Sequence, residues 1–262
     1  MELYLITGFL GAGKTTFLKN FARQFAGRRL RLIINEFGRV GVDGTLLREL
    51  DAALDEISNG SIFCACRLDQ FEAALEQAAA DAPDVVLVEA SGLADPTNVR
   101  RVLAQFPAVS YQGSVCVADA ARLEKVFSTA RACHRQLAVS SLVLLNKTDL
   151  ATEAQCAEAK ALILRANPAA RIRRTQFGRF EPEWLSLIVP DVDVDEVLDM
   201  PDITLQKAVL QIRPTMPFAA LQKCLVQLAG ETWRIKGFVR VPEGIFYVDC
   251  TGPEVRLTPW QG

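Results

Sequence analysis

The chain has 262 residues, of which 50% are apolar and 23% are charged, and its formal net charge is −2. This length can bury a full α/β core, and the balanced charge excludes the strongly basic surface that binds nucleic acid or anionic lipid. No apolar run approaches membrane-spanning length, so no membrane partner is expected. Seven cysteines, an odd number, favour reduced thiols and a cytoplasmic location.

Short β-branched apolar runs alternate with helix-patterned segments through the first two thirds of the chain. Strands are predicted at 3–7, 30–35, 84–90, 114–119, 141–147 and 170–175. Apolar residues recur at helical spacing in 14–25 and in 68–80. Apolar strands separated by amphipathic helices are typical of a doubly wound, mostly parallel sheet covered on both faces, which is the predicted α/β fold.

The first predicted strand leads into GFLGAGKTT, which matches the phosphate-loop pattern G-x-x-x-x-G-K-[ST]. Glycines let the backbone curl so that N–H groups point at phosphate oxygens, and the following helix adds its dipole. We expect Lys14 to reach the β- and γ-phosphates and the Thr15 hydroxyl to bind Mg²⁺. The strand and helix flanks disfavour the alternative of a simple glycine-rich turn. The residues predicted to bind nucleotide here are Gly8, Gly11, Ala12, Gly13, Lys14, Thr15 and Thr16.

The strand predicted at 84–90 ends in a carboxylate, Glu89, which Ser91 and Gly92 follow closely. Nucleotide hydrolases place a Mg²⁺-water ligand and a γ-phosphate-sensing glycine at such a strand end. Glu89 and Gly92 are therefore predicted in those two roles. Asp95, which precedes a proline, is predicted to cap the start of a helix.

The sequence NKTD, from Asn146 to Asp149, follows the apolar strand SLVLL at the edge where an open α/β sheet presents its ligand loops. Guanine offers an N1–H and an N2 amine as adjacent donors, which the Asp149 carboxylate can accept. The Lys147 stem can lie along the base face. These residues predict a guanine nucleotide, and a polar turn with Asp149 near a helix start is the alternative.

The regular alternation ends after about residue 176. A proline- and aspartate-rich stretch, 179–205, is interpreted as a connector between a first domain, 1–178, and a small α+β unit, 206–262. That unit is predicted to contain a strand at 207–213, a helix opened by Pro217 and three further strands.

The ordered motifs resemble the CobW family of P-loop GTPases, relatives of the UreG and HypB nickel chaperones. The order is GFLGAGKTT, NEFG-x-VG-x-D (35–43), a cysteine segment, E-x-S-G-L-A-D-P and NKTD, and RIKGF (234–238) is similar to the family's C-terminal unit. The resemblance implies Mg²⁺-dependent GTP hydrolysis that gates metal delivery to a client metalloprotein or a cobalamin-related enzyme. The expected catalytic residues are Lys14, Thr15, Glu36, Glu89 and Gly92.

The cysteine segment contains Cys64 and Cys66, which can chelate one soft or borderline ion, with zinc or cobalt expected. The family usually has C-x-C-C where this chain has 61–64, and commonly has Glu where this chain has Arg39. Two thiolates are incomplete for tetrahedral zinc, so further ligands are expected from Glu36, Asp43, water, a second chain or a client. Packing of both cysteines in a core is the alternative.

Two other functional classes and one assembly state stay open at this stage. A nucleotide-gated module that sequesters metal or docks an enzyme would have negligible turnover. A P-loop kinase of a small metabolite is opposed by NKTD. A homodimer formed on GTP is compatible with the sequence.

Overall fold

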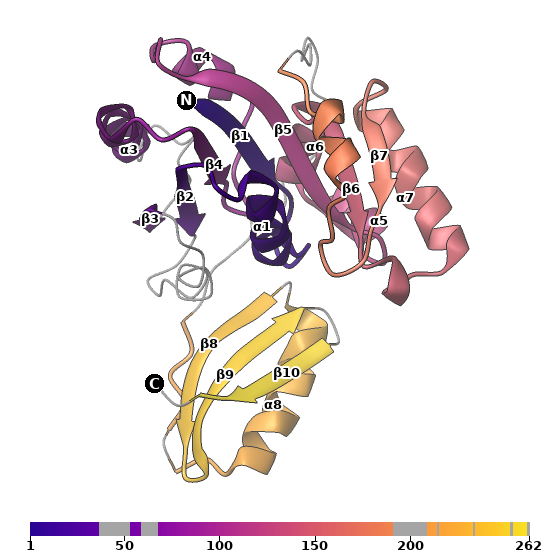
Figure 1. Ribbon diagram of the computed structural model, residues 1–262. Coiled ribbons are helices and arrows are strands. Elements are labelled where there is room, and N and C mark those ends of the chain that lie inside the picture. Colours follow the sequence, from indigo (N-terminus) through magenta and orange to yellow (C-terminus); the bar gives the residue numbers. More distant parts are fainter. Residues whose placement is uncertain are drawn as a thin grey trace. The chain divides into compact units, whose positions relative to one another are not determined.

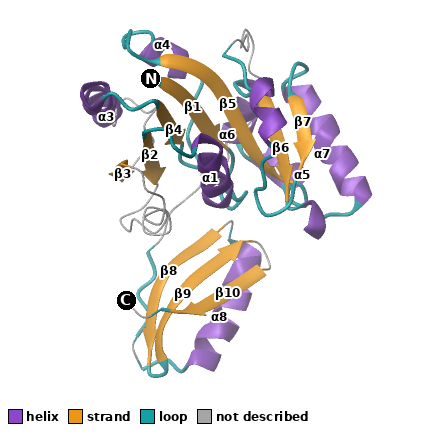
Figure 2. Cartoon of the chain, viewed as in Figure 1, coloured by secondary structure: helices purple, strands orange, loops and turns teal. Residues whose placement is uncertain are grey.

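The computed structural model describes residues 1–36, 53–58, 68–190, 209–213, 215–232, 234–251 and 254–260. The chain divides into two compact units, Met1–Ile203 and Thr204–Gly262. Figure 1 labels the helices and strands of both units, and Figure 2 colours them by type.

The first unit is built on a parallel sheet, as predicted. Its strands are β1 (Glu2–Thr7), β2 (Leu30–Glu36), β3 (Ala53–Ser58), β4 (Val85–Glu89), β5 (Ser110–Asp119), β6 (Leu142–Asn146) and β7 (Arg171–Arg174). Seven strands pair in the order β3-β2-β4-β1-β5-β6-β7, and every described pair in this sheet is parallel. The edge strand β3 was not predicted, because its sequence ALDEIS carries two acidic residues within a short run.

Helices connect these strands and cover both faces of the sheet (Figure 2). The α-helices are α1 (Lys14–Ala22), α3 (Leu68–Asp81), α4 (Val99–Leu103), α5 (Leu123–Thr129), α6 (Arg131–Ala138) and α7 (Glu153–Ala166). Three 3₁₀ segments are η1 (Arg23–Phe25), η2 (Thr148–Leu150) and η3 (Pro182–Leu187). The start of α7 has a capping box in which the Thr152 side chain accepts from the Gln155 N–H and the Gln155 side chain accepts from the Thr152 N–H.

One face of the sheet is covered by α1, which presents the apolar stripe predicted from its helical spacing. Phe17 and Phe21 are fully buried, with ring centroids 5.2 Å apart. Phe21 also contacts the Phe180 ring at 4.8 Å, so the segment after β7 packs on this same face. Each fully buried phenylalanine contributes about 1.5–3 kcal/mol to stability. This core fixes the start of α1, where the phosphate loop ends.

The opposite face is covered by α3 and α4. Phe71 and Leu75 of α3 are fully buried against Val86 and Val88 of β4 and against Ile33 of β2. β4 is buried on both faces because α1 and α3 pack on opposite sides, which explains its unbroken apolar sequence VVLVE.

The first part of the predicted connector packs into the core of the first unit. Phe180 and Ile188 are buried in the same cluster as the α1 phenylalanines, and Trp184 packs against them. Aromatic side chains bury large areas, so these residues fasten 180–188 to the sheet. In the second unit, residues 209–213 form no strand, in contrast to the prediction of one at 207–213.

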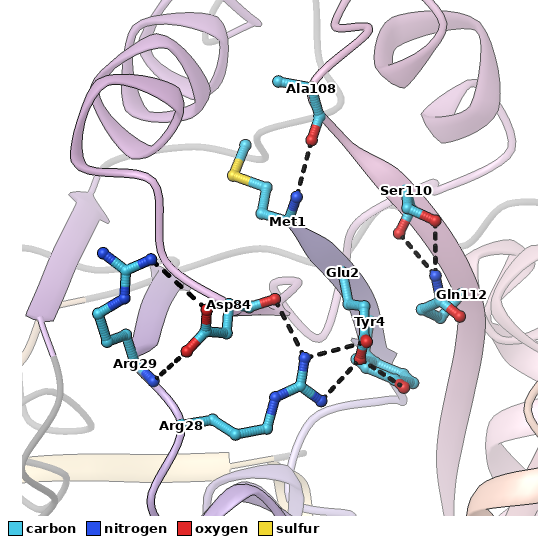
Figure 3. Close-up of polar contacts among 9 residues, drawn as sticks. All are labelled: Met1, Glu2, Tyr4, Arg28, Arg29, Asp84, Ala108, Ser110 and Gln112. Carbon is cyan, nitrogen blue, oxygen red and sulfur yellow. Dashed lines mark hydrogen bonds and ion pairs between the residues drawn. The ribbon is translucent and has the colours of Figure 1, made fainter.

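Polar contacts fasten the amino ends of the central strands, at the edge of the sheet opposite the strand ends that lead into the predicted ligand loops (Figure 3). The Arg28 guanidinium lies 2.9 Å from the Glu2 carboxylate, and it lowers the pKa of that carboxyl group by hydrogen bonding. The Arg29 backbone N–H donates to the Asp84 carboxylate at 2.8 Å. These contacts join the start of β1 to the turns that precede β2 and β4.

The second unit is a small α+β sandwich. Its helix α8 (Phe218–Glu231) packs on an antiparallel sheet of β8 (Arg234–Val241), β9 (Gly244–Thr251) and β10 (Glu254–Pro259), in the order β10-β9-β8. The buried residues are Leu221, Leu225, Ala229, Val241, Val248 and Cys250. The predicted helix and the three predicted strands after it are all present.

In the part of the chain that the structure describes, no helix combines the length and the apolar character needed to cross a membrane.

Candidate functional site

The carboxyl ends of β1, β4, β5 and β6 bring three of the predicted motifs to one edge of the sheet. β1 lies between β4 and β5, and the phosphate loop begins directly after it. Ile6 of β1 is in register with Glu89 of β4, and Asp119 of β5 is in register with Asn146 of β6. In open α/β sheets ligands bind outside these strand ends, where the chain reverses its direction of winding.

The phosphate loop needs its glycines for two separate reasons. Gly8, Gly11 and Gly13 have φ values of 135°, 75° and 101°, a region that L side chains rarely adopt. In addition, a Cβ on Gly8 would lie only 2.2 Å from the carbonyl oxygen of Val117 in β5. The loop therefore lies directly against the neighbouring strand, a contact that only glycine permits.

Lys14, the first residue of α1, folds back over this loop. Its Nζ donates to the Gly8 carbonyl at 2.9 Å, and the side chain is only 6% exposed. A buried ammonium is stabilised by oxygen acceptors and by anions. The Thr15 side chain is half-buried and the Thr16 side chain is exposed. The arrangement places a cation and a helix N-terminus together, which suits the binding of phosphate groups.

Asn146 joins the phosphate loop to the loops that follow β6 and β7. It is 2% exposed; its Nδ2 donates to the Ala12 carbonyl at 2.9 Å, and its Oδ1 accepts from the Gly178 N–H at 3.0 Å. A Cβ on Gly13 would lie 2.5 Å from the same Nδ2. Two motifs separated by more than 130 residues are therefore packed together through one buried amide.

Lys147 and Asp149 lie on the outer side of this bridge. Lys147 has φ 60° and ψ 35°, a left-handed conformation that costs an L residue about 1–2 kcal/mol. Its Nζ pairs with the Asp119 carboxylate at 2.9 Å, and the Thr148 side chain donates to the Thr175 carbonyl at 3.1 Å. These contacts hold the strained turn in place. The Asp149 side chain is exposed, so its carboxylate is accessible to the hydrogen-bond donors of a base.

The loop 175–179, after β7, was not singled out from the sequence. Phe177 and Gly178 both have positive φ, at 55° and 62°. Asn20 of α1 donates to the carbonyls of both residues, at 3.1 Å and 3.0 Å, and the Phe177 side chain is 60% exposed. A signal was available, because the FG dipeptide lies in the loop that follows the last strand of an open parallel sheet.

We expect Gly178→Ala to destabilise the site much more than an ordinary positive-φ glycine substitution. A Cβ there would lie 2.7 Å from the Phe17 backbone nitrogen. The expected loss in the free energy of unfolding is about 3 kcal/mol or more, from backbone strain and overpacking together. Nucleotide affinity should fall as well, because Gly178 holds Asn146. Denaturant unfolding and nucleotide titration measure the two effects.

Gly27→Ala is the matched control for this substitution. Gly27 also has positive φ, 83°, but a Cβ there would meet nothing within 4 Å. Only the conformational strain remains, so the expected loss is about 1 kcal/mol with unchanged nucleotide affinity. Equal losses in the two variants would show that Gly178 makes no close contact with α1.

Glu89 ends β4 and is 4% exposed, beside the strand that leads into the phosphate loop. The Ser91 N–H donates to Asn35 Oδ1 at 3.3 Å, which ties the next residues to β2. Gly92 lies against the phosphate loop, since a Cβ there would be 2.8 Å from the Leu10 backbone nitrogen. Glu89, Gly92 and the phosphate loop are thus brought together, as the motif order predicts.

Asp95 does not cap the helix that follows it. α4 begins at Val99, and its N-cap residue, Asn98, makes no side-chain cap. Asp95 instead accepts from the N–H and hydroxyl of Thr97, at 3.2 Å and 2.7 Å, and pairs with Arg135 of α6. Three residues separate the aspartate from the first residue of the helix, so its carboxylate closes a local turn instead.

The predicted transition-metal ligands cannot be placed. Asp43, Cys64 and Cys66 lie outside the described residues, as do Arg39 and the side chain of Glu36. Elsewhere, among the described residues, no group of three or more His, Cys, Asp or Glu side chains could hold a metal ion.

Cys116, Cys133 and His134 are buried in the first unit. Burial raises the pKa of Cys116 to about 12 and that of Cys133 well above its usual range, so both thiols stay protonated. His134 is 1% exposed, its Nε2 lies 2.7 Å from the Phe127 carbonyl, and burial lowers its pKa. None of these three groups is prepared to ligate a metal.

Comparison with known proteins gives a family match over most of the first unit. Residues 2–174 match the family described as CobW/HypB/UreG, nucleotide-binding domain. The chain is 26% identical over 226 residues to the zinc chaperone YjiA of Escherichia coli, covering 82% of this chain and 66% of that protein. It is 32% identical over 206 residues to the zinc chaperone CobW of Pseudomonas aeruginosa, covering 65% of this chain and 55% of that protein.

A solved structure supports the fold at a lower level of sequence similarity. The Zn(II)-bound YjiA GTPase from E. coli superposes with a TM-score of 0.51 at 19% identity, covering 100% of this chain and 90% of that chain. The chain spans between 47% and 66% of the length of the first curated relatives that it matches.

Proposed function

The chain belongs to the CobW/HypB/UreG family, and from this premise we propose that it is a GTP-binding and GTP-hydrolysing metallochaperone. In this proposal the nucleotide state controls the binding and delivery of a transition metal of the zinc or cobalt class to a client protein or cofactor pathway. A homodimer is one form in which the delivery could occur.

The Asn146 bridge is the single observation that best supports nucleotide binding. It packs the phosphate loop against the NKTD loop through bonds to Ala12 and Gly178. A nucleotide needs one loop for its phosphates and another for its base, held at a fixed separation. A buried amide that hydrogen-bonds to both sides provides this rigid connection.

The residues near the phosphate loop fit Mg²⁺. Thr15 offers a hydroxyl in the first turn of α1 and Glu89 a buried carboxylate at the end of β4, and both are the oxygen donors that Mg²⁺ prefers. We propose that Thr15 holds the ion directly and Glu89 through water. Bound Mg²⁺ would neutralise charge on the β- and γ-phosphates. Lys14 would bind the same phosphates, and the Gly92 N–H would donate to the γ-phosphate.

Support for metal delivery comes from the relatives and from the order of the motifs. The relatives named above are zinc chaperones, and Cys64 and Cys66 lie in sequence between the NEFG-x-VG-x-D segment and Glu89. A metal bound there would be close in the chain to two segments that contact the nucleotide. An incomplete ligand set suits transfer better than storage, because a client can supply the missing ligand.

The proposed function predicts that replacing Cys64 and Cys66 by serine abolishes stoichiometric zinc or cobalt binding while basal GTP affinity is retained. A serine hydroxyl stays protonated near neutral pH and cannot replace a thiolate. The test is a titration of the purified protein with zinc, cobalt and nickel, with and without a non-hydrolysable GTP analogue. If GTP changes metal affinity by some factor, metal must change GTP affinity by the same factor, and the double variant should lose both effects.

Cys224→Ser is the matched control, because Cys224 is a half-buried free thiol of α8 in the second unit. It should leave metal binding unchanged. Metal binding that survives in the double variant, together with a lower thermal midpoint, would assign the two cysteines to a core. Phosphate release in the same samples separates a GTPase from a module without turnover, and phosphorylation of a small metabolite would identify a kinase.

A further inference from the structure

A buried glutamine of α6 lies beneath the segment that contains the proposed γ-phosphate sensor. Gln136 is 0% exposed, and its Nε2 donates to the carbonyls of Gly92 and Ala94, at 3.2 Å and 3.0 Å. Because both partners are carbonyl acceptors, the amide has only one possible orientation. One side chain of α6 therefore holds two carbonyls of a short turn, 91–94, which follows β4.

This turn is held from several sides at once. Asn35 of β2 accepts from the Ser91 N–H at 3.3 Å, and the Ala94 N–H closes the turn on the Ser91 carbonyl at 2.9 Å. Gly92 lies against Leu10 of the phosphate loop, where a Cβ would be 2.6 Å from the Leu10 side chain. The Gly92 N–H makes no hydrogen bond within the described part of the chain.

The hydrogen bonds thus occupy the carbonyls of Ser91, Gly92 and Ala94 and leave the Gly92 N–H as a donor beside the phosphate loop. A donor that is already in place loses little conformational entropy when it meets an oxygen of the ligand. The Gln136 Oε1 accepts no hydrogen bond from any described residue, which carries a desolvation penalty that an apolar side chain would avoid. The two donor bonds are what this glutamine adds to the site.

The helix that carries Gln136 is itself fixed. Arg135 pairs with Asp95, just beyond the turn. Just after Gln136, where α6 ends, the Asn167 Nδ2 donates to the carbonyls of Leu137, Ala138 and Ser140, at 3.0, 3.2 and 2.9 Å. Asn167 is also buried, and its hydrogen bonds do not involve the 91–94 turn.

We propose that Gln136 is a positioning residue for recognition of the γ-phosphate. It fixes the 91–94 turn against the phosphate loop so that the Gly92 N–H meets a nucleoside triphosphate and not a diphosphate. The proposal rests on the function proposed above. α6 contains none of the nucleotide-binding motifs, and through Gln136 it would help to distinguish GTP from GDP.

The test compares Gln136→Met with Asn167→Leu. Each substitution removes a buried amide that contacts α6 or lies on it and leaves an apolar side chain of similar size, but only Gln136 contacts the turn. We expect Gln136→Met to weaken binding of a non-hydrolysable GTP analogue by about 10-fold, the loss of a well-placed hydrogen bond, with GDP affinity changed less than about 2-fold. Asn167→Leu should leave the ratio of the two affinities unchanged.

An unchanged ratio in folded Gln136→Met would overturn the inference and leave the proposed function intact. Equal changes in both variants would overturn it too, since the effect would then come from docking of α6. Failure of the unmodified protein to bind either nucleotide would overturn the proposed function itself.

If Gln136→Met does not fold, hydrogen exchange of the unmodified protein gives the answer. The Gly92 amide should be protected by the GTP analogue and not by GDP, and equal protection by both would overturn the inference.

Discussion

Lys14→Met should lower the rate of GTP hydrolysis by about 10³-fold, the range found when a cationic or donor group that meets transition-state charge is removed. The Lys14 Nζ lies inside the curve of the phosphate loop, 2.9 Å from the Gly8 carbonyl. This side chain would place its ammonium next to phosphate groups bound in that curve. Single-turnover phosphate release measures the loss, and a nucleotide titration separates binding from chemistry.

Lys14→Met is expected to change the stability of the protein little, so a loss of activity can be assigned to the missing ammonium. Lys14 is 6% exposed, and methionine retains the length of its stem without an ammonium that needs a partner. Removing the ammonium relieves the cost of burying a charge, which offsets the hydrogen bond lost at the Gly8 carbonyl. The variant should therefore keep a thermal midpoint close to that of the unmodified protein while losing activity.

Lys19→Met removes a positive charge from the same helix, one turn further from the loop, and should retain turnover. If Lys14→Met hydrolyses GTP at the original rate, the phosphate-loop interpretation is wrong.

Asp149→Asn should lower GTP affinity by about 100-fold and create affinity for xanthosine triphosphate. The Asp149 carboxylate is exposed on the 3₁₀ turn Thr148–Leu150, which the strained Lys147 backbone orients. A carboxylate accepts from both guanine donors, whereas an amide offers one acceptor and one donor, which matches the N1–H and the C2 carbonyl of xanthine. Loss of two charge-assisted bonds sets the magnitude. Competition titrations with GTP, ATP and xanthosine triphosphate measure both affinities.

Glu153→Gln controls for the lost charge, because Glu153 is an exposed carboxylate at the start of α7 that pairs with Arg174 at 2.7 Å. It should leave nucleotide preference unchanged. Equal binding of ATP and GTP by the unmodified protein would contradict the guanine assignment, as would an Asp149→Asn variant without new affinity for xanthosine triphosphate.

Local patterns in the sequence were sufficient to predict the sheet and the phosphate loop. The strands of the parallel sheet are buried on both faces, so they appear as unbroken apolar runs such as VVLVE, and the glycines at 8, 11 and 13 report the positive φ values of the loop directly. The edge strand β3 escaped detection because an edge strand is partly exposed and tolerates acidic residues. Burial and backbone conformation leave local patterns in the sequence, so they can be predicted without knowledge of the tertiary contacts.

Contacts between distant segments could be decided only by the tertiary structure. Asn146 was predicted, with the rest of NKTD, to bind the nucleotide, and the structure adds that its buried amide joins Ala12 and Gly178, from loops 134 and 32 residues away. Gln136 belongs to no sequence motif. In the sequence it cannot be told from an ordinary solvent-exposed glutamine of an amphipathic helix. Its importance comes from the two carbonyls that the fold places above it. The sequence by itself determined which segments form strands, helices and ligand loops, because those depend on local propensity and burial; which side chains hold the loops together depends on packing across the sheet, and only the tertiary structure specifies that.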